Sequence, residues 1–255
     1  MNKNYHTHTP RCHHATGNEE EYIKAAIKAG HSLIGFSDHS PWQYDSSYRP
    51  TMRMEVRDIK NYVETLRRLK EKYSDQITVK IGFECEYFPK YMDWLKEMLE
   101  EYQIDYIILG NHFKESDELG LYYGSPTKKE AILKSYVDDA IHAFETGLYS
   151  YIAHPDLIHY QHFKSELYKQ EITRLCLEAK KRDIPLEFNL LGYSTHRHYP
   201  NPIFWQIAAE VGNKAILGID AHDLFQYEDE DSINEAENYL KPLGIEIVDD
   251  IRFLR

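Results

Sequence analysis

The chain contains 255 residues with 42 acidic and 30 basic side chains, which gives a formal net charge of −12. So acidic a chain is a poor candidate for broad electrostatic binding to nucleic acid or to an anionic membrane surface. The opening MNKNYHTHT lacks the apolar stretch of a signal peptide, and no apolar run of membrane-spanning length occurs. The three cysteines form no CxxC pair. We therefore expect a cytoplasmic protein without a disulfide framework or a cysteine-based zinc site.

Short strand-like runs alternate with longer helical runs along the whole chain. The expected strand and helix pairs are 3–8 with 19–29, 32–37 with 55–73, 77–83 with 91–101, 105–109 with 128–146, 151–153 with 165–182, 185–188 with 202–211 and 214–218 with 233–240, and 245–248 is a candidate eighth strand. This alternation predicts a parallel sheet in an α/β protein, with a strand count close to that of a closed barrel. We expect one domain over residues 1–255, folded as a distorted (β/α)7 TIM-like barrel. Residues 39–54 and 191–201 are predicted to be long loops.

Histidines and carboxylates follow the ends of six predicted strands. They are His6 and His8 on the first, His39 on the second, Glu84 on the third, His112 on the fourth, His154 on the fifth, and Asp220 and His222 on the seventh. Barrel active sites form at the carboxyl ends of strands, so these side chains are expected to meet at one site. Imidazole and carboxylate ligands suit zinc, manganese or iron, and their number exceeds what one ion needs. Glu84 is the best candidate for a bridging ligand.

The same residues stand in a series of short motifs. These are HTHT at 6–9 followed by His14, SDH at 37–39, Glu84, GNH at 110–112, AHP at 153–155 and IDAH at 219–222. In order and strand context the series resembles the polymerase-and-histidinol-phosphatase (PHP) family, and the resemblance covers most of the chain. It implies a distorted barrel of about seven βα units around a site for two or three metal ions.

The resemblance also implies how the ligands divide among three divalent ions. One ion would be held by His6, His8, Glu84 and Asp220, a second by Glu84, His112 and His154, and a third by His14, His39 and His222. His13, beside His14, is the alternative for that one ligand. Zinc is the first expectation for the metal, with manganese or iron as alternatives. Glu84, Asp220 and His222 are the expected catalytic subset of these ligands.

Three divalent ions against two carboxylates would give the site a net positive charge, which would attract a phosphate dianion into an otherwise acidic protein. Because metal ions lower the pKa of bound water towards about 7, we expect direct attack on phosphorus by a hydroxide that bridges two metals. No side-chain nucleophile is assigned. Asp220 or a metal-bound water would protonate the leaving oxygen, and the sequence leaves both open.

Basic side chains near the strand ends are candidates for binding the phosphate oxygens. Arg197, in the loop after the sixth strand, is the first choice, Arg11 is the second, and Lys114 is the third. Glu115 and Asp117 are candidates for contacting a substrate ammonium group. Each of these residues has an ordinary solvated surface role as its alternative. Glu187 and Asn189, at the end of the sixth strand, could orient the ligands or contact substrate.

Within the PHP family, the opening YHTHTPRCHHATG and the insert SPWQYDSSYRPTMRM are most similar to the histidinol-phosphate phosphatase branch. That likeness implies hydrolysis of the small phosphate ester L-histidinol phosphate to L-histidinol and phosphate, a step of histidine biosynthesis. The alternatives are a phosphodiesterase or 3′-exonuclease of the same family, a phosphatase of another small ester, or a metal-storage or scaffold protein. The acidic charge weighs against a nucleic-acid substrate, and the oligomeric state stays open.

Overall fold

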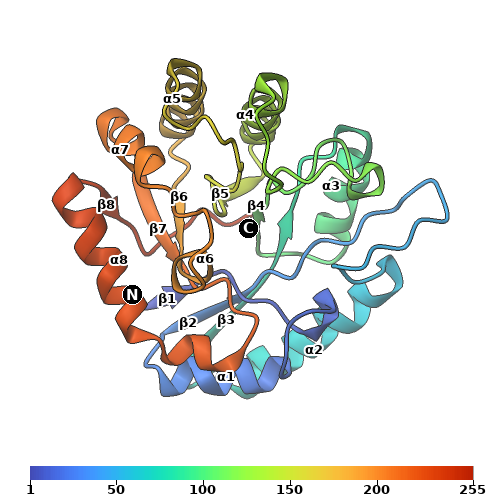
Figure 1. Cartoon of the computed structure of the whole chain (residues 1–255). Coiled ribbons are helices and arrows are strands. Elements are labelled where there is room, and N and C mark those ends of the chain that lie inside the picture. The colour runs from blue at the N-terminus through green and yellow to red at the C-terminus, as the bar shows by residue number, and fades with distance from the viewer. Residues whose placement is uncertain (255) are drawn as a thin grey trace.

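The computed structural model describes residues 1–254. Eight parallel strands pair in chain order. They are β1 (Lys3–Asn4), β2 (Leu33–Phe36), β3 (Thr78–Cys85), β4 (Tyr106–Leu109), β5 (Tyr149–Ile152), β6 (Leu186–Asn189), β7 (Lys214–Gly218) and β8 (Glu246–Ile247). Figure 1 shows these strands curled around a common centre with helices on the outside. The predicted α/β barrel is therefore confirmed.

The ring of strands closes between the segments that follow β1 and β7. Thr7 and Ala221 form a parallel bridge. The backbone N–H of His8 donates to the carbonyl of Ala221 (2.8 Å), and the N–H of Ala221 donates to the carbonyl of His6 (3.1 Å). The segments after β1 and β7 meet directly, and β8 pairs with β7 alone among the described strands. This closure brings the HTH and DAH segments side by side.

Seven longer helices pack around the sheet: α1 (Glu19–Lys28), α2 (Ile59–Lys72), α3 (Met92–Glu101), α4 (Glu130–Glu145), α5 (Glu166–Lys181), α7 (Pro202–Val211) and α8 (Glu230–Leu240). Each has one apolar face, as in α2, where Ile59, Tyr62, Val63, Leu66 and Leu69 are buried. Several of these helices begin at a residue whose side chain caps the first turn. Asn18 accepts a hydrogen bond from the N–H of Glu21, and Ser165 accepts one from Tyr168. None of the described helices is both long and apolar enough to span a bilayer.

Side chains fill the barrel interior toward the amino ends of the strands. Tyr5, Leu33, Tyr106, Ile108, Tyr151, Ala153, Ile216 and Ile251 form one buried cluster. The Tyr106 hydroxyl donates to the carbonyl of Tyr5 (2.6 Å), and its ring lies so close to Gly82 that a Cβ there would stand 2.5 Å from it. Near the C-terminus, Phe253 packs on Tyr5 and Tyr106, and the N–H of Leu254 donates to Asp105, just before β4. The amino end of the barrel is thus covered, which leaves the carboxyl ends of the strands for a site.

Of the two long loops predicted at 39–54 and 191–201, the first is largely irregular and the second contains part of a helix. Within the loop predicted at 39–54, His39 forms a single parallel bridge with Glu84, and residues 40–54 contain no helix or strand, as predicted. The segment predicted as a loop at 191–201 instead begins inside a short helix, α6 (Leu190–Ser194). The prediction was wrong there because the Asn189 side chain caps this turn by accepting a hydrogen bond from the N–H of Gly192 (2.8 Å).

Candidate metal centre

The carboxyl ends of the strands bring together all nine side chains that the sequence singles out as metal ligands. They form three groups whose ligand atoms lie within 4.8 Å of one another: His6, His8 and Asp220; Glu84, His112 and His154; and His14, His39 and His222. A fourth group, His8, His39 and Glu84, connects them. The second and third groups have the same members as the family resemblance implies, whereas Glu84 is not part of the first group; the assignment of ions to these groups stays a prediction.

The first group is fully enclosed. The Nε2 atoms of His6 and His8 lie 3.1 Å apart, and Oδ1 of Asp220 is 3.3 Å from the first and 3.2 Å from the second. Two ligand nitrogens around a tetrahedral zinc with bonds of about 2.0–2.1 Å are about 3.3–3.4 Å apart. The separations in this group therefore suit ligands that converge on one small cation.

Glu84 stands between two of the groups. Its Oε1 lies 2.9 Å from Nε2 of His154 and 3.3 Å from Nε2 of His112. Its Oε2 lies 2.9 Å from Nδ1 of His39, 3.5 Å from Nε2 of His8 and 3.6 Å from Nε2 of His6. Each oxygen thus faces a different set of imidazoles, as a bridging carboxylate would.

Of the neighbouring residues His13 and His14, it is His14 whose ring lies in the third group. Nδ1 of His14 donates to the carbonyl of Cys12 (2.6 Å), and its Nε2 lies 3.0 Å from Nε2 of His222. His13 is exposed and lines a separate cavity beside Arg11. Nδ1 of His222 is turned toward the carbonyl of Asp220 (2.9 Å), which leaves its Nε2 for the centre of the group.

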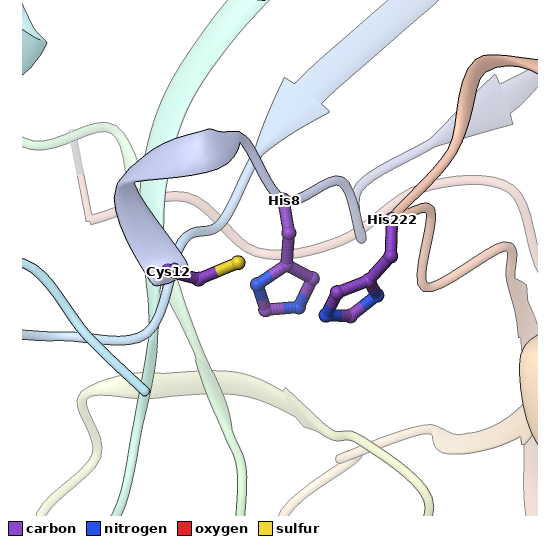
Figure 2. Close-up of side chains that lie close together, drawn as sticks. All are labelled: His8, Cys12 and His222. Carbon is purple, nitrogen blue, oxygen red and sulfur yellow. The ribbon is translucent and has the colours of Figure 1, made fainter. Parts of the chain in front are cut away.

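Cys12 also approaches the centre. Figure 2 shows its sulfur directed toward His8, with His222 on the opposite side of that ring. The three side chains meet the same distance criterion as the other groups, but both imidazoles are shared with those groups. Burial raises the pKa of the Cys12 thiol to about 12, so the thiol is protonated at neutral pH. Its present role is therefore packing beside the ligands.

Unpartnered buried atoms show that the centre fits a cation. Oε2 of Glu84 and Nδ1 of His39 are buried without hydrogen-bond partners, although they are only 2.9 Å apart. A buried carboxylate oxygen without a donor is costly unless a cation neutralises it. The donor set, imidazole nitrogen and carboxylate oxygen, is the one that zinc, manganese and iron accept. These residues therefore fit divalent metal ions.

The charges of the site agree with this chemistry. Burial opposes ionisation of Glu84 and Asp220, yet the surrounding imidazoles, His112 first for Glu84 and His6 first for Asp220, hold the pKa of each carboxyl well below its ordinary value. Burial lowers the pKa of His39 far below its usual range and that of His222 to about 4. The carboxylates are thus anionic and these two rings neutral, the forms in which such groups bind a metal. The same carboxylates raise the pKa of His6 and, to about 10, that of His112, so a metal ion that bound there would displace a proton from each ring.

Two further features hold the ligands in place. Nδ1 of His6 donates to Oε1 of Glu187 (2.7 Å), and Oε2 of Glu187 accepts from the N–H of His154 (2.9 Å). The backbone of Asp220 (φ 53°) and His154 (φ 29°) lies in the left-handed region, which side chains other than glycine adopt at a cost. The fold therefore stores strain at two ligand positions to aim them inward.

A pocket of about 490 Å³ opens directly over the ligands. Its wall is formed by Met52, Phe113, Tyr122, Leu157, Leu191, Arg197 and Tyr199. Nη1 of Arg197 donates to the Tyr199 hydroxyl (2.7 Å), which holds the guanidinium at the wall. Sequence reasoning selected Arg197 but missed Tyr199 and Tyr122. The phenol two residues after Arg197 was the available signal for the first of them.

The other predicted substrate contacts lie outside this pocket lining. Nε of Arg11 donates to Glu19 (2.8 Å), and the side chain lines the separate cavity beside His13. Nζ of Lys114 lies 3.7 Å from Oε1 of Glu115 at the surface. Asp117 is buried and ion-paired to Arg53 (3.0 Å). The structure thus brings only Arg197 of these residues to the wall of the pocket.

A closed ring of parallel strands with clustered imidazoles and carboxylates at its carboxyl end defines the class of metal-dependent barrel enzymes. Residues 4–190 match the model of the PHP domain. The chain belongs to the PHP domain family.

Named relatives and solved structures agree with this membership. The chain is 27% identical over 237 residues to the Deinococcus radiodurans protein named "Probable histidinol-phosphatase", with 85% of each chain covered. It is 26% identical over 249 residues to the histidinol-phosphatase of Bacillus subtilis, with 85% of this chain and 92% of the relative covered. The crystal structure of histidinol phosphate phosphatase from Lactococcus lactis, complexed with zinc, L-histidinol and phosphate, has a TM-score of 0.72 at 18% identity and covers 100% of this chain and 99% of its own.

Proposed function

We propose that this protein is a metal-dependent phosphomonoesterase that hydrolyses L-histidinol phosphate to L-histidinol and inorganic phosphate. The observation that carries the proposal is the position of Glu84, whose two oxygens face two different groups of imidazoles at the floor of the pocket. Relatives named for this reaction are similar along 85% of the chain. The whole chain would form one catalytic domain, acting in the cytoplasm in histidine biosynthesis.

The proposed ligands are His6, His8, His14, His39, Glu84, His112, His154, Asp220 and His222, and we infer three ions, with zinc first and manganese or iron as alternatives. Bound divalent ions would polarise the phosphoryl oxygens and lower the pKa of water. The protein itself contributes the fixed geometry. Glu84, Asp220 and His222, the proposed catalytic subset of these ligands, all line the pocket.

The phosphate end of the substrate would lie on this floor beside Arg197. That guanidinium is fixed by the Tyr199 hydroxyl and retains further N–H donors for phosphate oxygens. Aromatic and apolar side chains of the wall, among them Phe113 and Leu157, would contact the carbon skeleton and ring of the alcohol half. The pocket volume of about 490 Å³ suits a small phosphate ester and not a folded macromolecule.

The leaving alkoxide needs a proton, and Asp220, whose carboxylate the neighbouring imidazoles keep ionised, is a candidate for relaying one from water to it. One of its oxygens faces His6 and His8, and the other accepts from Nδ2 of Asn189 (3.1 Å). Substrate entering from the pocket would meet this side chain beside His222. A geometric position of this kind is the first requirement for an acid that acts on the leaving group.

The test is phosphate release by the zinc-reconstituted protein from three substrates: L-histidinol phosphate, a nucleoside monophosphate and a short oligonucleotide. We expect turnover of L-histidinol phosphate with kcat/KM well above that for the other two. Robust oligonucleotide cleavage without histidinol phosphate turnover would contradict the proposal and favour the phosphodiesterase alternative. Metal analysis of the same preparation should give at least two ions per chain.

A further inference from the structure

Arg53 is a buried arginine on the long loop between β2 and α2, although most of that loop is exposed or half-buried. Figure 1 shows this light-blue segment extending from the barrel past α3. The Arg53 side chain is 0% exposed. A charge buried to this extent is stable only when it is paired and fully hydrogen-bonded, so its partners indicate why it lies there.

The main partner of Arg53 is Glu86, which stands two residues after Glu84 at the end of β3. Nη2 of Arg53 donates to Oε1 of Glu86 (2.6 Å), and Nη1 donates to Oε2 (2.9 Å), so the pair is bidentate. Glu86 is also 0% exposed.

Glu86 connects this ion pair to a proposed metal ligand. Its Oε1 lies 3.1 Å from Nδ1 of His112, while Nε2 of the same ring lies 3.3 Å from Oε1 of Glu84. An anionic carboxylate can only accept a hydrogen bond, so Nδ1 carries a proton toward Glu86, which leaves Nε2, beside Glu84, as the nitrogen that would bind a metal ion. Glu86 and Glu84 thus contact the two nitrogens of the same imidazole ring, one on each side.

Side chains and a carbonyl of the surrounding loops make further hydrogen bonds to Arg53 and Glu86. Nε1 of Trp42 donates to Oε2 of Glu86 (3.1 Å), and Nη1 of Arg53 also donates to the carbonyl of Ser40 (2.7 Å). Nε of Arg53 donates to Asp117 (3.0 Å), whose other oxygen accepts from the Tyr44 hydroxyl. The network therefore joins the 40–54 loop, the end of β3 and the loop that follows His112.

The loop also contributes to the pocket. Met52, the residue next to Arg53, lines the pocket above the ligands. Because Arg53 is anchored on Glu86 and Asp117, Met52 is carried to a fixed place at the wall. The same buried arginine thus sets a metal ligand on one side and part of the substrate pocket on the other.

We propose that Glu86 and Arg53 are positioning residues of the metal centre: Glu86 fixes the orientation of the His112 ring through Nδ1, and Arg53 holds Glu86 in place while docking the 40–54 loop against it. This inference rests on the proposed function, since it concerns a ligand of the proposed metal centre. Partners of this kind, lying behind a ligand, change metal affinity by about 10–100-fold when they are removed.

The first experiment measures zinc affinity by chelator competition for Glu86→Gln and Arg53→Lys, beside the wild-type protein. Arg174→Lys is the matched control, because Arg174 also contacts two carboxylates, Asp138 and Glu171 (both 2.7 Å), away from the site. We expect about 10–100-fold weaker binding of one zinc ion in the first two variants and no change in the control. Folded variants with wild-type zinc affinity would overturn the inference.

The second experiment keeps the inference testable if the buried variants fail to fold. Long-range ¹H–¹⁵N correlation of zinc-loaded wild-type protein with ¹⁵N-labelled histidine identifies which nitrogen of each ring carries the proton. We expect the His112 signal, assigned through its loss in His112→Gln, to show protonation at Nδ1. Protonation at Nε2 would refute the inference whatever the variants do.

The two experiments also separate this inference from the proposed function. Wild-type protein that binds zinc and turns over L-histidinol phosphate, with Glu86→Gln indistinguishable from it, would remove the positioning role alone. Wild-type protein that binds neither zinc, manganese nor iron(II) after reconstitution would remove the proposed function and this inference with it. In the supporting case, the Arg53→Lys variant also shows a raised KM, because Met52 loses its anchor at the pocket wall.

Discussion

Gly110 lies directly against Glu84: a Cβ added at Gly110 would stand 2.4 Å from Oε1 and 2.6 Å from Cδ of that carboxylate. The same added atom would be 2.5 Å from Cε1 of His112. Contacts this short force a shift, and both neighbours are proposed ligands. The glycine of the GNH segment is therefore needed for the approach of Glu84 to β4, independently of any turn.

Gly110→Ala should impair the metal centre while the barrel still folds. Displacing Glu84 by about 1 Å is expected to lower kcat/KM by about 100-fold, since catalytic geometry is sensitive on that scale. Steady-state kinetics and metal content check this together. Gly120→Ala is the control: its backbone has φ 76° and an added Cβ meets nothing within 4 Å, so it should cost stability without changing kcat/KM. Equal kinetics for the two variants would exclude the steric role of Gly110.

Arg197→Ala should lower kcat/KM and leave metal content unchanged, because the guanidinium lines the pocket but belongs to none of the ligand groups. Loss of a charge-assisted hydrogen bond costs about 1.5–3 kcal/mol, which corresponds to about 10–100-fold in kcat/KM. Arg197→Lys should recover part of the loss. Wild-type kinetics in Arg197→Ala would remove this residue from the site.

Much of this site could be predicted from sequence because its ligands follow strands. Strand ends are marked by short apolar runs, and parallel strands end at one edge, so His6, His112 and Asp220 could be placed together before any coordinates were known. Arg53 and Glu86 gave no such signal. Arg53 reaches its partners through the irregular 40–54 loop, whose path follows from tertiary contacts with Trp42 and Tyr44 and has no periodicity to detect. The same limit explains why Arg11 was expected at the pocket, whereas its actual partner is Glu19.

Removal of metal should reduce both activity and stability. The unpartnered Oε2 of Glu84 and its close approach to three imidazoles are tolerable with a bound cation and unfavourable without one. Ligand linkage predicts about 2.7 kcal/mol of stabilisation at a free zinc concentration 100 times Kd. Thermal unfolding before and after chelation, and after zinc is restored, measures this difference. An unchanged Tm together with undiminished activity in excess chelator would contradict a metal-dependent site.

The free energy of unfolding is expected to depend on pH through Asp139, which lies on α4 away from the proposed ligands. The Tyr123 hydroxyl donates to Oδ2 of Asp139 (2.6 Å). Burial, as the main cause, raises the pKa of this carboxyl to about 6, although the hydrogen bond from Tyr123 favours its charged form. A carboxyl whose pKa is higher in the folded state binds its proton more tightly there. Its stabilising contribution is therefore present in full below the unfolded value of about 3.9 and is lost as the pH rises through about 6.

Asp139→Asn removes this titration and keeps an acceptor for Tyr123. We expect the free energy of unfolding of the wild type to fall relative to that of the variant by about 1–2 kcal/mol between pH 4 and pH 7, a figure reduced for the partial exposure of the site. Urea unfolding of both proteins at several pH values, with metal removed, gives the difference directly. Because the ligand groups titrate alike in the two proteins, their contributions cancel in this comparison. A difference that stays constant across this range would show that Asp139 titrates as an ordinary exposed carboxyl.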